Sequence, residues 1–337
     1  MTNPGKGGET MKPLLEVNDL EISFFNGKRA CKCTDSVRFS VQPGEILCIV
    51  GESGCGKSIT ALSILGLLGR QGRVTGGEIL YQGRNLLDMR EKELDAICGS
   101  EISMIFQDIL YSLNPVFTIG NQLTEVIRRH LHYDRSAARE RAVELLERTG
   151  IPQPRIVMNK YPHQLSGGMR QRVMIAMALA CKPKLLIADE PTTALDVTIQ
   201  LQIMQLLRSL RDETGMAILL ITHDIGVVAE MADRVVVMYA GQCVEEAAAR
   251  QLLTSPAHPY TRALLAAVPG IHDDRNRRLM SIPGSVPEHY QELTGCRFAP
   301  RCPYAASCSC CAQPCETAPG HRVRCCAPLL RRLAHAE

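Results

Sequence analysis

Hydrophobic and polar residues alternate near the start of the chain, along residues 14–44. The apolar positions of this pattern include Leu15, Val17, Leu20, Ile22 and Phe24. A two-residue period is typical of strands with one buried face, so this segment predicts short antiparallel strands. The continuous apolar run at residues 45–50 predicts a fully buried strand, and residues 57–68 after it predict an apolar helix.

Strand and helix patterns then alternate through the middle of the chain. Residues 117–182 are mostly helical in pattern, and the charged and apolar residues of 136–148 indicate a surface helix. We expect a second buried strand at 184–189, a helix at 197–213 and a third strand at 217–222. This order predicts an α/β fold, with a mostly parallel sheet and helices on both of its faces.

The pattern changes towards the C-terminus. Pro256, Pro259 and Pro269 interrupt it, and beyond Gly270 the chain is polar, Pro-rich and Cys-rich without clear periodicity. These residues place a boundary near 250–275. The expected divisions are a disordered N-terminus at 1–13, a main domain at 14–265 with a helical subdomain at about 107–172, and a cysteine-rich extension at 266–337.

Composition narrows the functional classes. The chain has 337 residues, 45% of them hydrophobic, and a net charge of +3, so it can bury a large core but lacks the strongly basic balance of a nucleic-acid-binding domain. Basic runs such as 128–130 and 275–278 fit a solvated surface. No run of about 18 apolar residues spans a bilayer, and residues 1–12 lack the apolar stretch of a secretory signal. We therefore expect a cytosolic chain whose partners supply any membrane-spanning helices.

Residues 51–58, GESGCGKS, match the phosphate-loop pattern G-x-x-x-x-G-K-[ST] between an expected strand and an expected helix. In that setting main-chain N–H groups and the helix N-terminus attract phosphate oxygens. Lys57 can reach the outer phosphates, and the Ser58 hydroxyl can bind Mg²⁺. The candidate nucleotide-binding residues here are Gly51, Ser53, Gly54, Cys55, Gly56, Lys57, Ser58 and Ile59. Cys55 is interpreted as a small residue that contributes mainly its backbone.

Two carboxylates end the apolar strand expected at 184–189. Asp189 is a candidate to hold Mg²⁺, and Glu190 is a candidate general base that activates water for attack on the terminal phosphate. The alternative interpretation is that the pair only caps the turn at Pro191.

Residues 165–172, LSGGMRQR, resemble the signature motif of ATP-binding-cassette (ABC) proteins. Further segments are similar to that family's motifs: Gln107 to the Q-loop, Ala194–Asp196 to the D-loop, His223 to the switch histidine, and Phe24, with Phe25 as the alternative, to the adenine-stacking aromatic. The resemblance implies a P-loop NTPase cassette with an antiparallel β subdomain. It also implies that Gln107 senses Mg²⁺ and that Ser166, Gly167, Gly168 and Asp196 close over ATP held by a second ATPase subunit.

Three finer segments, 112–115 (SLNP), 257–261 (AHPYT) and 295–303 (GCRFAPRCP), resemble the dipeptide/oligopeptide and nickel importer subfamily. The resemblance implies a peripheral ATPase on the cytoplasmic face of the plasma membrane. Its implied partners are a second, different ATPase subunit, two permeases and an extracytoplasmic solute-binding protein, without nucleic acid. Ile109 and Ala247 depart from the pattern of the subfamily, where Pro and Gly are common.

Eight of the 15 cysteines lie between Cys296 and Cys326. In a reducing cytosol such clusters more often bind metal than form disulfides. The resemblance implies a [4Fe–4S] cluster on Cys296, Cys302, Cys308 and Cys325, with zinc or free thiols as alternatives. The third ligand is open, because the subfamily spacing falls on Ser309, between Cys308 and Cys310.

A rival to the importer is a soluble, non-transport ABC ATPase that acts in DNA repair or on ribosomes. Such relatives generally carry two cassettes, a coiled coil or zinc insertions, and the sequence contains none of these features and only one phosphate loop.

Overall fold

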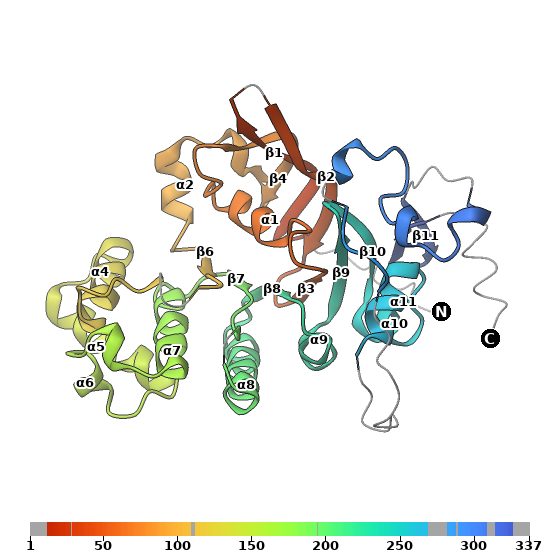
Figure 1. Ribbon diagram of the computed structural model, residues 1–337. Helices are drawn as coiled ribbons and strands as arrows, with labels where there is room; N and C mark the ends of the chain where they lie inside the picture. Colours follow the sequence, from red (N-terminus) through yellow and green to blue (C-terminus); the bar gives the residue numbers. More distant parts are fainter. Residues whose placement is uncertain are drawn as a thin grey trace, which may run out of the picture.

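The computed structural model describes residues 12–27, 29–108, 112–193, 195–268, 282–287, 289–308 and 314–325 (Figure 1). Most of the N-terminal segment expected to be disordered, residues 1–11, lies outside this part of the chain, as do Ile109, Ala194 and the basic run at 275–278. No helix within the described residues is long and apolar enough to cross a membrane.

A small antiparallel sheet forms from the alternating N-terminal segment. Its strand order is β2-β1-β4-β5. The strands are β1 (Leu15–Asn26), β2 (Arg29–Val41), β4 (Gly72–Tyr81) and β5 (Arg84–Asn85). The inward side chains of β1, including Leu15, Val17 and Leu20, are fully buried, because a two-residue period keeps them on one face. The prediction of antiparallel strands in this region is confirmed.

The large sheet has eight strands in the order β11-β12-β10-β9-β3-β8-β7-β6. Pairing is parallel from β9 to β6 and antiparallel from β9 to β11. The strands are β3 (Ile46–Val50), β6 (Ile102–Ile105), β7 (Leu185–Asp189), β8 (Ala217–Thr222), β9 (Arg234–Tyr239), β10 (Gln242–Ala248), β11 (Pro314–Ala318) and β12 (His321–Arg324). Every residue of β3, β7 and β8 is buried, as expected for parallel strands covered on both faces.

Helices surround the large sheet. Those that follow its strands are α1 (Lys57–Ile64), α8 (Val197–Thr214), α9 (Ile225–Met231), α10 (Ala249–Thr254) and α11 (Pro259–Ala266). The sequence predicted that this first helix would extend to residue 68, but α1 ends at Ile64. Gly66 has φ +68°, a left-handed conformation that is incompatible with continuing a right-handed helix. The predicted α/β fold with antiparallel and parallel sheets is confirmed.

A lobe of helices lies beside the sheet, at the left of Figure 1. It comprises α4 (Ile119–Leu131), α5 (Arg135–Arg148), α6 (Pro154–Val157) and α7 (Gly167–Ala178). Helix α2 (Glu91–Ile97) lies above it, next to the small sheet. Short 3-10 helices complete the structure: η1 (Leu86–Asp88), η2 (Pro162–Gln164), η3 (Tyr290–Glu292), η4 (Ala299–Arg301) and η5 (Ala305–Ser307).

The cysteine-rich extension continues the large sheet. Its hairpin β11–β12 pairs with β10 through Glu245–Val323 and Glu246–Arg322. These strands have four and five residues, too few to produce the periodic pattern that sequence reasoning looked for. His321 of β12 also connects the hairpin to β10, because its Nε2 lies 2.7 Å from Oε1 of the buried Glu245.

Candidate nucleotide-binding site

The phosphate loop leaves the carboxyl end of β3 and enters α1. Gly51 passes so close to β9 that an added Cβ would lie 2.1 Å from the Met238 carbonyl oxygen, so no side chain fits there. Gly54 and Gly56 have φ +78° and +101°, a region that favours glycine. The backbone therefore curls into a loop whose N–H groups precede a helix N-terminus, the usual geometry of a phosphate site.

The Lys57 amine is held at this loop by main-chain carbonyls. Its Nζ donates to the oxygens of Gly51 at 2.8 Å and Glu52 at 3.0 Å, and the side chain is almost completely buried. Cys55 is fully buried beside it, and burial raises the pKa of the Cys55 thiol. The cation is thus positioned for an anion while the neighbouring thiol stays protonated at neutral pH.

Oxygen ligands suited to Mg²⁺ meet where β7 ends beside the loop. The Ser58 hydroxyl donates to Oδ1 of Asp189 at 3.0 Å. Burial raises the pKa of Asp189, and the hydrogen bond from Ser58 opposes that shift. A hydroxyl and a carboxylate are hard oxygen donors, the kind that Mg²⁺ prefers in nucleotide sites, so these two residues fit the ion.

Glu190, the next residue, is surrounded by polar partners. Its Oε2 accepts from Gln107 Nε2 at 3.0 Å and from Thr193 Oγ1 at 2.9 Å, and His223 Nδ1 lies 3.2 Å from Oε1. Burial opposes ionisation of Glu190, but hydrogen bonds from Thr193 and His223 outweigh it and lower the pKa of the carboxyl group. The structure therefore brings Glu190, Gln107 and His223 together, with an ionised carboxylate among them at neutral pH.

Thr193 was missed by sequence reasoning. The sequence did contain a signal for it: Thr193 follows Glu190 by three residues, with Pro191 between them, which is typical of a β-turn. Such a turn brings its fourth residue close to its first, and the Thr193 N–H donates to the Glu190 carbonyl.

The signature segment lies in the helical lobe, apart from α1 (Figure 1). Ser166 caps α7 by accepting from the Met169 N–H at 3.3 Å. An added Cβ on Gly168 would lie 2.9 Å from Ile199 Cγ2 of α8, which requires a small residue. Asp196 caps α8 by accepting from the Ile199 N–H at 3.0 Å. The signature and Asp196 are thus neighbours, because Gly168 approaches the helix that Asp196 caps.

Phe24 and Phe25, the alternatives for the adenine contact, differ in exposure. Phe24 pairs with Cys31 and Gly72 in the small sheet and is half-buried. Its ring lies against Gly72, where an added Cβ would be 3.1 Å from Phe24 Cε1. Phe25 is exposed, and the Arg73 guanidinium lies 5.8 Å from its ring centre. A cation already covers one face of Phe25, which leaves Phe24 as the better candidate.

Four cysteines of the extension line one cavity. Cys296, Cys302, Cys308 and Cys325 surround a volume of about 200 Å³ next to His258 and Phe298. Burial raises the pKa of the Cys302 thiol, and the neighbouring Cys296 and Cys308 raise it further. Ser309, Cys310, Cys311 and Cys326 lie outside the described residues.

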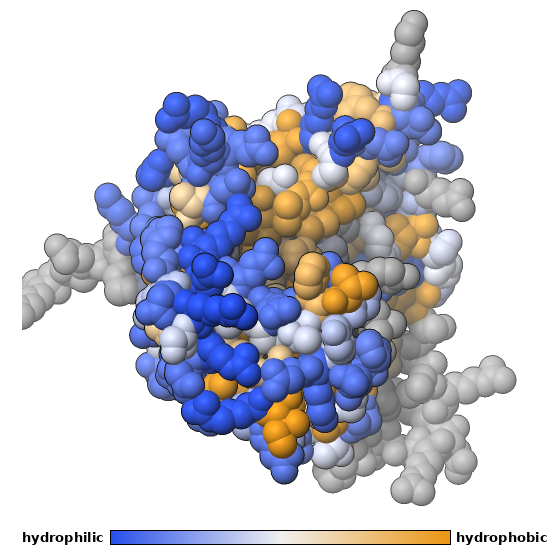
Figure 2. Space-filling model, turned by 90° about the vertical axis from the view of Figure 1, so that its left-hand side faces the viewer, coloured by the Kyte–Doolittle hydropathy of each residue, from blue (hydrophilic) through white to orange (hydrophobic). Residues whose placement is uncertain are grey.

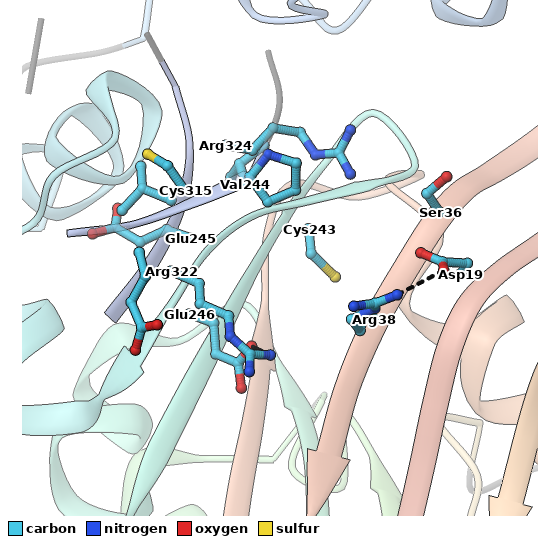
Figure 3. Close-up of a pocket in the computed structure, with 13 residues that line it drawn as sticks. Asp19, Ser36, Arg38, Cys243, Val244, Glu245, Glu246, Cys315, Arg322 and Arg324 are labelled. Atoms are coloured by element: carbon cyan, nitrogen blue, oxygen red, sulfur yellow. Dashed lines mark hydrogen bonds and ion pairs between the residues drawn. The ribbon is translucent and has the colours of Figure 1, made fainter. Parts of the chain in front are cut away.

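A larger cavity, about 640 Å³, lies between β2, β10 and the β11–β12 hairpin (Figure 3). Charged groups of both signs line it, among them Arg38, Arg322 and Glu246, and Arg38 is already paired with Asp19 at 2.7 Å. Cys315 lines this cavity and not the one formed by the other four cysteines. None of the candidate nucleotide-binding residues contributes to it, so it is separate from the phosphate loop.

Comparisons with known proteins agree with this geometry. The family model "ABC transporter" matches residues 34–193, and "Oligopeptide/dipeptide transporter, C-terminal region" matches residues 244–310. A dimeric ATP-binding cassette, MJ0796, solved in a post-hydrolysis state bound to ADP and Pi, is similar with a TM-score of 0.63 and 31% identity over 70% of this chain and 99% of that chain. Fold and site together define an ABC-type ATPase.

Curated relatives narrow the family. The chain is 51% identical to a probable peptide ABC transporter ATP-binding protein of Sinorhizobium fredii, over 93% of this chain and 94% of the relative. It is 50% identical to the dipeptide transport ATP-binding protein DppD of Escherichia coli, over 87% and 89% of the two chains. The oligopeptide transport ATP-binding protein AppD of Bacillus subtilis is 52% identical, over 88% and 90%. The chain therefore belongs to the ABC transporter ATP-binding family, in the group that carries the oligopeptide/dipeptide transporter C-terminal region.

Proposed function

We propose that this protein is the ATP-hydrolysing subunit of an ABC importer for dipeptides or oligopeptides. The observation that carries the proposal is the Glu190 carboxylate, ionised and in contact with both Gln107 and His223 beside the phosphate loop. The peptide cargo is supported by the C-terminal family match and by the names of the relatives. The same relatives favour an importer over a soluble ATPase of DNA repair or ribosomes.

Each site residue has a role in this proposal. Gly51 and residues 53–59 bind the ATP phosphates, with Lys57 on the outer ones, and Phe24 stacks on the adenine. Ser58, Asp189 and Gln107 hold Mg²⁺, which neutralises charge on the phosphates. Glu190 accepts a proton from the attacking water, and His223 contacts the terminal phosphate.

A second cassette completes the ATP site in this proposal. Ser166, Gly167 and Gly168 stand at the start of α7 in the helical lobe, which lies apart from α1 in Figure 1, and Asp196 caps the neighbouring α8. This arrangement supports their acting on ATP held by another subunit. The dimeric state named for MJ0796 supports this arrangement. We propose a different ATPase subunit as the partner.

Permease subunits need a surface on which to dock. A groove of about 480 Å³ runs between β6 and the helical lobe, lined by apolar residues that include Leu67, Phe106 and Met174. Figure 2 shows this side of the molecule, where hydrophobic residues gather in a hollow surrounded by hydrophilic ones. Phe106 directly precedes Gln107, so we propose that a short cytoplasmic helix of one permease occupies this groove and signals to the Mg²⁺ ligand. In this proposal the protein works at the cytoplasmic face of the membrane, next to permeases that receive cargo from a solute-binding protein.

Peptide uptake tests the proposed function. A strain of the source organism that lacks the gene should lose uptake of labelled dipeptide or oligopeptide and keep Ni²⁺ uptake. The wild-type gene should restore peptide uptake, whereas the Lys57→Ala gene should not. Unchanged peptide uptake in the deletion strain would contradict the assignment, and loss of Ni²⁺ uptake alone would replace peptide by nickel as the cargo.

We also propose that the cysteine cavity holds an iron–sulfur cluster. The proposal is supported by Cys296, Cys302, Cys308 and Cys325 lining one cavity, because thiolates are the ligands of iron–sulfur clusters. Thiolates also bind zinc, which is the alternative. A cluster would supply a redox-active group or a structural crosslink to the extension.

Metal analysis of anaerobically purified protein tests the cluster. Iron and sulfide should be present, and Cys302→Ser should lower both, while Cys181→Ser, outside the extension, should leave them unchanged. Colourless protein with stoichiometric zinc, or with no metal, would refute the proposal.

The domain division is likewise a proposal: an ATPase domain at 14–265, with its helical subdomain at about 107–172, followed by the extension at 266–337. The pairing of β12 with β10 makes the two domains share one sheet.

A further inference from the structure

The extension reaches the phosphate loop through one buried arginine. The guanidinium of Arg301 grips the Glu52 carboxylate with two hydrogen bonds, Nη1 to Oε2 at 2.7 Å and Nη2 to Oε1 at 3.0 Å. The Arg301 side chain is 5% exposed and that of Glu52 is 28% exposed. Two parallel N–H···O bonds in a largely buried place are the strongest geometry open to such a pair.

The remaining donors of Arg301 are also occupied, which fixes its orientation. Its Nε donates to the Pro283 carbonyl at 2.8 Å, and Nη2 reaches the Gly284 carbonyl at 3.3 Å. The guanidinium lies 5.7 Å from the centre of the Tyr239 ring. These contacts with the extension and with β9 fix the orientation of the Arg301 guanidinium towards Glu52.

Glu52 is in turn fixed at its backbone. Its N–H donates to the Tyr260 hydroxyl at 2.9 Å, and its carbonyl oxygen accepts from Lys57 Nζ at 3.0 Å. Tyr260 packs against Tyr239 and Phe298, with ring centres 4.7 and 5.5 Å apart. The residue whose carbonyl oxygen binds the lysine, Glu52, is therefore held at its N–H by a side chain from α11 and at its carboxylate by a side chain from the extension.

We propose that Arg301 is a positioning residue for ATP binding, through which the extension sets the nucleotide affinity of its own phosphate loop. The inference rests on the proposed ATPase function. Arg301 acts mainly by neutralising the Glu52 carboxylate, which is carried by the loop that must accept the negative phosphates. Its two hydrogen bonds also steady the side chain of the residue whose carbonyl oxygen accepts from Lys57. Without Arg301, Glu52 would lie unpaired beside the nucleotide and repel it.

Nucleotide titrations on the full-length protein test this role. Arg301→Gln should raise the Kd and the KM for MgATP about tenfold, with kcat at saturating ATP changed less than about twofold. Arg301→Lys should fall between, because lysine keeps the charge and loses the bidentate grip. The double variant Glu52→Gln with Arg301→Gln should recover most of the lost affinity, because the unpaired carboxylate is then absent.

Arg297 provides the matched control. It lies on the same segment, is equally buried, and binds Asp35 at 2.9 Å and the Ala240 carbonyl rather than the phosphate loop. Arg297→Gln should lower the melting temperature about as much as Arg301→Gln does and leave the KM for ATP unchanged.

Three results would overturn the inference: wild-type affinity in Arg301→Gln, an equal loss of affinity in Arg297→Gln, or a double variant as weak as the single one. If the wild-type protein itself failed to bind MgATP, the proposed function would fail instead, so the two failures are distinguishable.

Discussion

Charged residues have different roles in two regions of the large sheet. The first region, called the phosphate edge, is where β3 and β7 end beside the phosphate loop; the second, called the antiparallel edge, is the side formed by β9, β10, β12 and β11. Beside the phosphate loop, Lys57 Nζ donates to two main-chain carbonyls and to the Cys55 sulfur, and none of these acceptors carries a charge that cancels that of the lysine. On the antiparallel side of the sheet, Arg234 is paired with Glu246 and Arg297 with Asp35, and Glu245 binds His321. A cation on neutral acceptors can still attract an anionic ligand, whereas a cation paired with a carboxylate anchors structure. The phosphate edge is therefore arranged to bind an anionic ligand, and the ion pairs of the antiparallel edge stabilise the fold.

The largest effect we expect comes from removing the base at the phosphate edge. Glu190→Gln should lower the ATPase rate about a thousandfold, because general-base catalysis contributes about 10²–10⁴-fold. Phosphate release at saturating ATP measures the rate, and nucleotide titration should show that ATP still binds. Equal hydrolysis by the variant and the wild type would remove Glu190 from the catalytic site.

At the antiparallel edge, Glu245→Ala should destabilise the fold by about 3 kcal/mol, because it leaves His321 without its buried partner. Glu245 also accepts the N–H groups of Ala257 at 2.7 Å and His258 at 2.9 Å, which would lose an acceptor. Urea unfolding measures the change. Glu140→Ala, which breaks an exposed ion pair with Arg155, is the control and should leave the midpoint unchanged. Equal midpoints for the two variants would show that the Glu245 contacts do not hold this edge.

Acid should weaken the same edge. Burial lowers the pKa of His258 from 6.5 to about 4, so the folded state keeps this histidine neutral while the unfolded state gains a proton. The contribution of His258 to the free energy of unfolding is present in full above pH 6.5 and is lost as the pH falls towards 4. The free energy of unfolding should fall by about 2 kcal/mol between pH 6.5 and 5.

Unfolding free energies measured from pH 7 to 5 check this expectation. His258→Gln should flatten the decline in that window, and His163→Gln, at an exposed position in the helical lobe, should not. A wild-type decline that persists in His258→Gln would assign the acid sensitivity to other groups.

The smallest expected effect distinguishes the two aromatics near the adenine. Phe24→Ala should raise the Kd for ATP about fivefold, through loss of stacking, and Phe25→Ala should leave it near the wild-type value. Competition with a fluorescent ATP analogue measures both. The reverse order would move the adenine contact to Phe25, beneath Arg73.

Much of the fold followed from local patterns. The expected strand at 217–222 coincides with β8, and the helix expected at 197–213 differs from α8 by one residue at its end. Fully buried strands carry continuous apolar runs, and the alternation of strands with helices leaves few topologies open. Strands β9 and β10 were not predicted, and neither was the β11–β12 hairpin. The hairpin was missed because its strands are short and its pairing with β10 joins residues far apart in sequence.

The sequence by itself determined the phosphate loop, Asp189, Glu190, His223 and the membership they imply, because a tight loop between a strand and a helix works through consecutive residues. Only the tertiary structure decided that Thr193 and Gln107 meet on Glu190, that four cysteines share one cavity, and that Arg301 reaches Glu52. Arg301 and Glu52 are 249 residues apart, and no local pattern records which charges will pair once the extension has joined the sheet. That pairing is set by burial and by strand order, which exist only after the chain has folded.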